Sequence, residues 1–142
     1  GVKSKVLTAI RMEPIGEFYS KWKAIEAMEQ GYVVIMSAGT GNPYFSTDSA
    51  AALKASEIGA DALLKATKVD GVYTSDPKKD PKATKYASLK YETAIEKHLK
   101  VMDSAAFALC MENHIPIIVF DFFDKKALEA AVEGKTVGTI VS

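Results

Sequence analysis

The segment from Ser37 to Ala52, SAGTGNPYFSTDSAAA, gathers residue types that bind phosphate where an apolar strand is followed by a helix. Gly39 and Gly41 let the backbone approach a ligand closely and adopt positive φ angles. Hydroxyl side chains precede the expected helix, where unpaired backbone amides form a natural anion site. A phosphate group is therefore the ligand that this segment favours, and a plain strand-to-helix turn is the alternative.

Asp48 stands apart in this segment, because a carboxylate repels a phosphate group. Its presence is explained if it holds a lysine or a magnesium ion, or if it orients hydrogen-bond donors. The alternative is that Asp48 only caps the helix. The segment matches neither the P-loop, since no Gly-Lys-Ser/Thr follows, nor the Gly-x-Gly-x-x-Gly pattern.

A second candidate stretch runs from Leu63 to Pro77, LLKATKVDGVYTSDP. An apolar strand here would carry Lys65 and Lys68 to its carboxyl end, where lysines neutralise the oxygens of a transferring phosphate. Tyr73 can stack on a base, and Asp76 can accept a hydrogen bond from a sugar or a base. The alternative is a surface loop with solvated charges.

Apolar runs alternate with helical patterns along the chain, which indicates an α/β fold. We expect strands, buried where the apolar run is continuous, at 6–10, 32–36, 61–66, 115–120 and 136–141. We expect helices at 15–30, 48–58, 91–98, 103–113 and 124–133. The Asp-, Pro- and Lys-rich segment 70–86 predicts a long loop with a short hairpin. This order predicts a three-layer αβα sandwich with a mainly parallel sheet, which binds ligands at the carboxyl ends of its strands.

Two details of this pattern are specific. The helix at 15–30 is expected to bury Phe18, Trp22, Ile25 and Met28, which recur at spacings of three and four. Asp103 or Ser104 is expected to cap the helix at 103–113, and Ser46 or Thr47 the helix at 48–58.

The amino-acid composition excludes some classes of protein. The 142 residues suit one domain, 1–142, and the formal net charge of zero argues against a general nucleic-acid binder. No apolar run approaches the roughly 20 residues that span a bilayer, so no membrane partner is expected. The single cysteine, Cys110, is interpreted as a buried structural thiol, which fits a cytoplasmic setting.

Four motifs, in order along nearly the whole chain, resemble the bacterial UMP kinases of the amino acid kinase superfamily. They are AGTGNPYFSTDSAAA (38–52), KATKVDGVYTSDPKKDP (65–81), LKVMDSAAF (99–107), and IPIIVFD (115–121) with GTIV (138–141). The GTGNPYF element is specific within the superfamily. The resemblance implies an amino acid kinase-like fold and transfer of a phosphoryl group from Mg-ATP to UMP, giving UDP and ADP in pyrimidine nucleotide biosynthesis.

The resemblance also assigns roles to residues of this chain. The UMP site would comprise Thr40, Gly41, Asn42, Pro43, Tyr44, Phe45, Ser46 and Thr47. The ATP contacts would be Thr67, Tyr73 and Asp76, and the catalytic group Asp48, Lys68 and Lys65, with no protein-bound metal site. The cofactors would be ATP and Mg²⁺, the assembly a homohexamer, and the effectors GTP as activator and UTP as inhibitor.

The chain departs from the family's pattern in one respect. The family's first phosphate-binding glycine loop, its first catalytic lysine, and the Gly-Gly turn with the Arg and Asp that hold UMP have no counterpart here. We therefore expect 1–142 to be the C-terminal, nucleotide-binding portion of the domain, and to be inactive or unstable alone. Two other readings stay open. One is a superfamily kinase acting on aspartate, glutamate or acetylglutamate, against which the NPYF element argues. The other is a non-catalytic nucleotide-binding or oligomerisation module.

Overall fold

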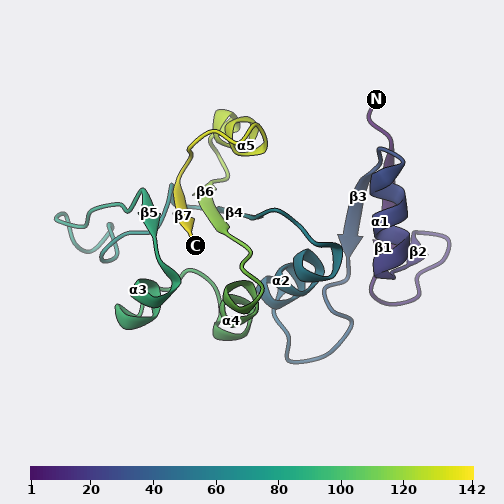
Figure 1. The fold of residues 1–142 in the computed structure, drawn as a ribbon, viewed down its shortest axis with the longest axis horizontal. Coiled ribbons are helices and arrows are strands. Elements are labelled where there is room, and N and C mark those ends of the chain that lie inside the picture. The colour runs from purple at the N-terminus through teal and green to yellow at the C-terminus, as the bar shows by residue number, and fades with distance from the viewer.

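The computed structural model describes residues 1–142 as an elongated α/β molecule, with the N-terminal elements at one end and the loop between β4 and β5 at the other (Figure 1). The elements, in chain order, are β1 (Ser4–Thr8), β2 (Glu17–Phe18), α1 (Lys21–Glu29), β3 (Val33–Ser37), α2 (Thr47–Ile58), β4 (Leu63–Thr67), β5 (Ser88–Leu89), α3 (Tyr91–Glu96), α4 (Ser104–Glu112), β6 (Ile117–Asp121), α5 (Lys125–Val132) and β7 (Thr139–Val141). None of these helices combines the length and apolar character needed to cross a bilayer.

The strands form two sheets, in the orders β2-β1-β3 and β4-β6-β7-β5. All strand pairs are parallel except β6 with β7. The mainly parallel α/β fold predicted from the apolar strands is therefore confirmed, although the strands divide between two sheets. The predicted hairpin in segment 70–86 is also present, as an antiparallel bridge between Tyr73 and Lys85.

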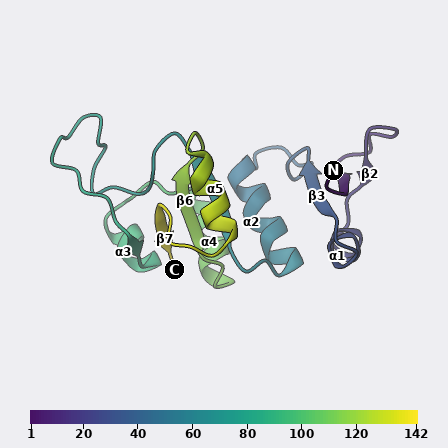
Figure 2. The same cartoon turned by 90° about the horizontal axis from the view of Figure 1, so that it is seen from above.

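The second sheet is covered on both faces. Helix α5 lies on one side of it, while α3 and α4 lie on the other (Figures 1 and 2). The core between the sheet and α4 includes Cys110, which is fully buried as predicted, and burial raises the pKa of its thiol. The remaining large side chains of this core include Leu63, Tyr91, Phe107, Ile117, Val119 and Val141. The strands of the second sheet are thus stabilised by apolar contacts on their faces, as the continuous apolar runs in the sequence predict.

Helix α2 lies between the two sheets, where it packs against α1 on one side and β4 and α4 on the other (Figure 2). The hydroxyl of Tyr19, just after β2, donates a hydrogen bond to Oε2 of Glu57 at 2.6 Å. The Lys54 ammonium lies 3.6 Å from the centroid of the same Tyr19 ring, and burial lowers the pKa of Lys54. These contacts fix the N-terminal sheet against the helix that leaves the Ser37–Ala52 segment.

Strands β3 and β4 are the facing edges of the two sheets, and each lacks a partner on its outer side. Residues of both strands and of α2 line an apolar groove of about 560 Å³. The prediction that strand 32–36 is fully buried is wrong, because Val33 is 56% and Ile35 49% exposed. No element within residues 1–142 covers this face of the edge strand.

The predicted helix at 15–30 begins only at Lys21. Residues 17 and 18 pair with β1 instead, and the Ser20 side chain caps the helix by accepting a hydrogen bond from the Lys23 amide at 3.3 Å. The predicted buried face is also wrong, since Trp22 is 69% exposed and the helix buries Ala24 and Ala27. The other helices lie within two residues of their predicted ends.

Candidate functional site

The carboxylate of Asp48 and the ammonium of Lys65 form the central ion pair of the candidate site. Asp48 lies in the first turn of α2, and Lys65 lies in the middle of β4. Their Oδ2 and Nζ atoms are 2.5 Å apart, with side chains 30% and 22% exposed. The two candidate stretches of the sequence therefore meet at one point, and the carboxylate holds a lysine as one of the sequence hypotheses required.

Lys68 does not join this pair. It follows the end of β4, and its side chain is exposed without a hydrogen bond or an ion pair to any residue of the chain. The structure thus brings one of the two predicted lysines to Asp48 and leaves the other in solvent.

The predicted acceptor-binding loop, Thr40–Thr47, is built from consecutive turns. Gly41 has a φ of +75°, and a Cβ there would lie 2.8 Å from the carbonyl oxygen of Ala9, so only glycine fits. The Thr40 hydroxyl accepts a hydrogen bond from the Asn42 amide at 3.1 Å. Positions 41–47 are all exposed, which leaves their polar groups accessible to a ligand.

This loop ends at the N-terminus of α2, which Ser46 caps as predicted. Its Oγ accepts a hydrogen bond from the Ser49 amide at 3.0 Å. The other amides of the first turn point along the helix axis toward the loop, where the helix dipole favours a negative charge. Asp48 in the same turn and its partner Lys65 add a fixed carboxylate and a fixed cation to this anion site.

A cleft of about 660 Å³ opens beside Lys65, a size typical of a small-molecule site. All three residues predicted to contact ATP line it: Thr67, Tyr73 and Asp76. Lys65 lines it as well, so the ion pair with Asp48 lies at the wall of this cleft. Lys65 of the pair thus lines the cleft, and its partner Asp48 directly follows the loop Thr40–Thr47.

Two groups of residues, one lining the cleft and one beside it, were missed by sequence reasoning. Lys97, His98 and Lys100 line it from the segment after α3, and the two lysines add positive charge to its wall. The short basic run KHLK, 97–100, is the only sequence signal that marks them, and nothing local indicates that it folds next to Tyr73.

The second missed group orients Tyr73. Its hydroxyl donates to Oδ1 of Asp70 at 2.7 Å, and the other oxygen of Asp70 pairs with Lys85 Nζ at 2.7 Å. The bonds from Lys85 and Tyr73 lower the pKa of Asp70. The aromatic ring at the cleft is therefore held by an ionised carboxylate.

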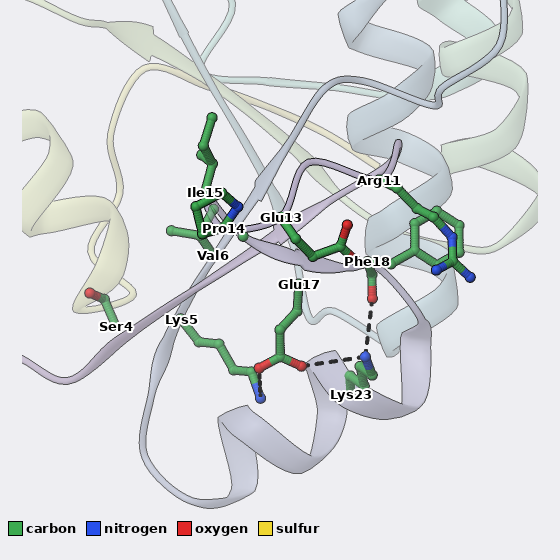
Figure 3. Close-up of a pocket in the computed structure, with 11 residues that line it drawn as sticks. Ser4, Lys5, Val6, Arg11, Glu13, Pro14, Ile15, Glu17, Phe18 and Lys23 are labelled. Atoms are coloured by element: carbon green, nitrogen blue, oxygen red, sulfur yellow. Dashed lines mark hydrogen bonds and ion pairs between the residues drawn. The ribbon is translucent and has the colours of Figure 1, made fainter.

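Another hollow lies among β1, β2 and the start of α1, and Figure 3 shows its lining. Three of its charged side chains are paired with one another: Glu17 contacts Lys5 at 2.9 Å and Lys23 at 3.3 Å, and these bonds lower the pKa of Glu17. Arg11 stacks over the Phe18 ring at 5.4 Å. This hollow is at the N-terminal end of the molecule, and none of the predicted site residues line it.

No group of three or more His, Cys, Asp or Glu side chains in the chain is arranged to hold a metal ion. Asp48, in the first turn of α2, is already engaged by Lys65. A magnesium ion here would have to be held mainly by phosphate oxygens and water, which is the usual state of Mg²⁺ bound with a nucleotide.

The sequence of residues 8–121 matches the amino acid kinase family. This match covers most of the chain, and the chain belongs to the amino acid kinase family. Within that family it is similar to the uridylate kinases of Phocaeicola vulgatus, 59% identical over 141 residues, and of Porphyromonas gingivalis, 58% identical over 142 residues. The alignments cover 99% and 100% of this chain, but only 60% and 59% of those two proteins. The chain thus spans about three fifths of the length of the curated relatives it matches.

Comparison with solved structures also shows that the chain corresponds to part of longer proteins. The UMP kinase from Bacillus anthracis superposes with a TM-score of 0.95 at 34% identity, covering 99% of this chain and 58% of that one. The UMP kinase from Ureaplasma parvum superposes with a TM-score of 0.93 at 41% identity, covering 99% and 60%. The arrangement of the two sheets is therefore that of a corresponding part of longer proteins.

Proposed function

We propose that the protein containing this chain is a kinase that transfers the γ-phosphoryl group of ATP to UMP, giving UDP and ADP. The observation that carries the proposal is the Asp48–Lys65 pair, placed between the loop Thr40–Thr47 and the cleft lined by Thr67, Tyr73 and Asp76. Phosphoryl transfer needs two substrates held on either side of a charge-stabilising group. The similarity to uridylate kinases supports UMP as the acceptor.

Each part of the site has a task in this proposal. The amides and hydroxyls of the loop and of the α2 N-terminus bind the phosphate of UMP. The cleft binds ATP, with Tyr73 against the base and Lys97 and Lys100 near the phosphates. Lys65 stabilises the charge on the transferring group, and Asp48 holds its ammonium in place. Mg²⁺, bound with ATP, supplies further neutralisation of the phosphate oxygens.

We also propose that 1–142 forms the C-terminal, nucleotide-binding portion of one kinase domain. The groove between β3 and β4 supports this, because each is the unpaired edge of its sheet and offers backbone groups to a further strand. The remaining two fifths of the relatives' length is a source for that strand. A homohexamer, regulation by GTP and UTP, a role in pyrimidine biosynthesis and a cytoplasmic location belong to the same proposal, and they rest on the resemblance to bacterial UMP kinases.

The test is an acceptor panel with the protein produced with all of its residues. ATP and Mg²⁺ are supplied with UMP, CMP, aspartate, glutamate or acetylglutamate, and products are separated chromatographically. We expect UDP with UMP and far slower reaction with the carboxylates. Phosphorylation of a carboxylate in preference to UMP would show a different member of the family. ATP binding without transfer to any acceptor would favour a non-catalytic module.

A further inference from the structure

Asp103 joins the N-termini of two helices. It is the N-cap of α4, where its Oδ1 accepts a hydrogen bond from the Ala106 amide at 3.0 Å. The same Oδ1 accepts from the Ser49 hydroxyl of α2 at 3.2 Å. Its other oxygen, Oδ2, accepts a short hydrogen bond from the hydroxyl of Ser46. One carboxylate thus connects α4 to both the last turn of the loop and the first turn of α2.

These bonds determine how the Ser46 hydroxyl is oriented. An ionised carboxylate only accepts hydrogen bonds, so Ser46 must donate its proton to Asp103. The Ser46 oxygen then presents a lone pair to the Ser49 amide, which is the capping bond of α2. The bonds from Ser46 and from the Ala106 amide lower the pKa of Asp103, so it stays ionised at neutral pH.

We propose that Asp103 is a positioning residue for the acceptor-binding loop. It fixes the Ser46 end of that loop and, two residues further on, the place of Asp48 opposite Lys65. The inference rests on the proposed function, because it gives Asp103 a role in binding the nucleoside monophosphate. Asp103 acts through Ser46 and does not itself touch the reacting groups.

The substitution Asp103→Asn tests this role selectively. An asparagine whose Oδ1 occupies the same place retains the bonds from Ala106 and Ser49 and remains a good N-cap. Its Nδ2 replaces Oδ2 and is a donor, so the acceptor for Ser46 is lost. A lost hydrogen bond to a charged group corresponds to roughly a 10- to 100-fold effect. We expect KM for UMP to rise by that factor, with KM for ATP unchanged.

The matched control is Asp124→Asn. Asp124 caps α5 in the same way, accepting from the Lys126 amide at 2.9 Å, and it lies outside the site. We expect this variant to keep the wild-type KM values and, because asparagine is about as good an N-cap as aspartate, an unfolding temperature close to that of the wild type. Equal kinetic effects in the two variants would show that Asp103 is only a helix cap, and would overturn the proposal.

Ser46→Ala, and the double variant that combines it with Asp103→Asn, complete a double-mutant cycle. If Asp103 acts through Ser46, the two substitutions are not additive, and the double variant binds UMP about as weakly as either single one. Additive effects on KM for UMP would contradict the proposal.

Amide hydrogen exchange of residues 40–47 in the nucleotide-free protein separates this inference from the proposed function. We expect faster exchange of this loop in Asp103→Asn, and also in Ser46→Ala should Asp103→Asn fail to fold. Unchanged exchange overturns the positioning role whatever the reaction is. Faster exchange in a protein that forms no UDP would leave the loop contact standing and remove the proposed function instead.

Discussion

The Lys65 ammonium lies 2.5 Å from the Asp48 carboxylate, although the two residues are 17 positions apart in the sequence. The contact joins the middle of β4 to the first turn of α2. A partly exposed ion pair of this kind contributes about 1 kcal/mol or less to stability. Its value is therefore in placing a positive charge between the loop and the cleft.

Substitution of Asp48 should separate catalysis from binding. We expect Asp48→Ala to lower kcat by about 10²- to 10³-fold, because Lys65 loses the partner that holds it toward the transferring group. KM for UMP should change far less. Steady-state kinetics with both substrates measure this, with Asp61→Asn, an exposed acid beyond α2, as the control. Equal losses in turnover and UMP affinity would assign Asp48 to binding.

Tyr73 should act through its ring. We expect Tyr73→Ala to raise KM for ATP by roughly tenfold, as loss of a base-stacking contact predicts, while Tyr73→Phe retains most of the affinity. Phenylalanine loses only the bond to Asp70, which remains paired with Lys85. Titration of ATP binding by calorimetry distinguishes the two variants. A phenylalanine variant as weak as the alanine variant would show that the hydroxyl matters instead.

Stability should fall in acid. Hydrogen bonds lower the pKa of both Asp70 and Asp103 below the usual value of 3.8. Such groups add stability that is fully present above the unfolded-state pKa and is lost as pH falls through the lower folded-state pKa. We expect the free energy of unfolding to decrease from about pH 4 downward, measured by urea titration across pH. Asp103→Asn should flatten part of that decrease, and an unchanged slope would contradict the assignment.

Gly138 should tolerate no side chain. Its φ is +61°, and a Cβ there would lie 1.8 Å from the carbonyl oxygen of Val119 in β6. We expect Gly138→Ala to destabilise the protein by more than 2 kcal/mol, roughly the upper range for single substitutions with a named steric cause. Gly134→Ala is the control, because its φ is +73° but no atom lies within 4 Å of the added Cβ. Equal urea midpoints for the two variants would exclude a steric origin.

Residues 1–142 produced alone should form no UDP and should self-associate. The edge of β3 and its exposed Val33 and Ile35 side chains are the reason, since unpaired apolar edges bind other chains. Light scattering after size exclusion measures the association, and Val33→Thr with Ile35→Thr should reduce it. A monomer with robust turnover would show that these residues contain a complete site.

The parts of the site that were predictable are those specified by neighbouring residues. Glycines, hydroxyls and Asp48 follow one another in the sequence, and Ser46 caps α2 by a purely local bond. The role of Lys97 and Lys100 was not predictable, because it depends on the packing of the segment after α3 against the 70–86 loop. Lys68 shows that closeness in sequence can also mislead, because it is three positions from Lys65 and yet makes no contact with Asp48.

The fold follows the same division. The alternation of apolar strands with helices predicted the α/β class and most element ends. It misassigned residues 15–20, whose apolar spacing fits a helix, because pairing of Glu17 and Phe18 with β1 satisfies their backbone groups instead. Periodicity also treats an apolar strand as buried on both faces, whereas β3 is an edge strand with one face uncovered.

The strand order of the second sheet governs when each half of the chain can become structured during synthesis. The strands β1, β2 and β3 of the first sheet lie within residues 4–37, so the hydrogen bonds among them can form while translation continues. In the second sheet, β7 lies between β5 and β6 but is made last. A polypeptide that ended before Thr139 would have its N-terminal strands paired, but it would lack the strand that pairs with both β5 and β6. Such an incomplete sheet exposes unpaired edges, which makes the polypeptide prone to proteolysis and aggregation.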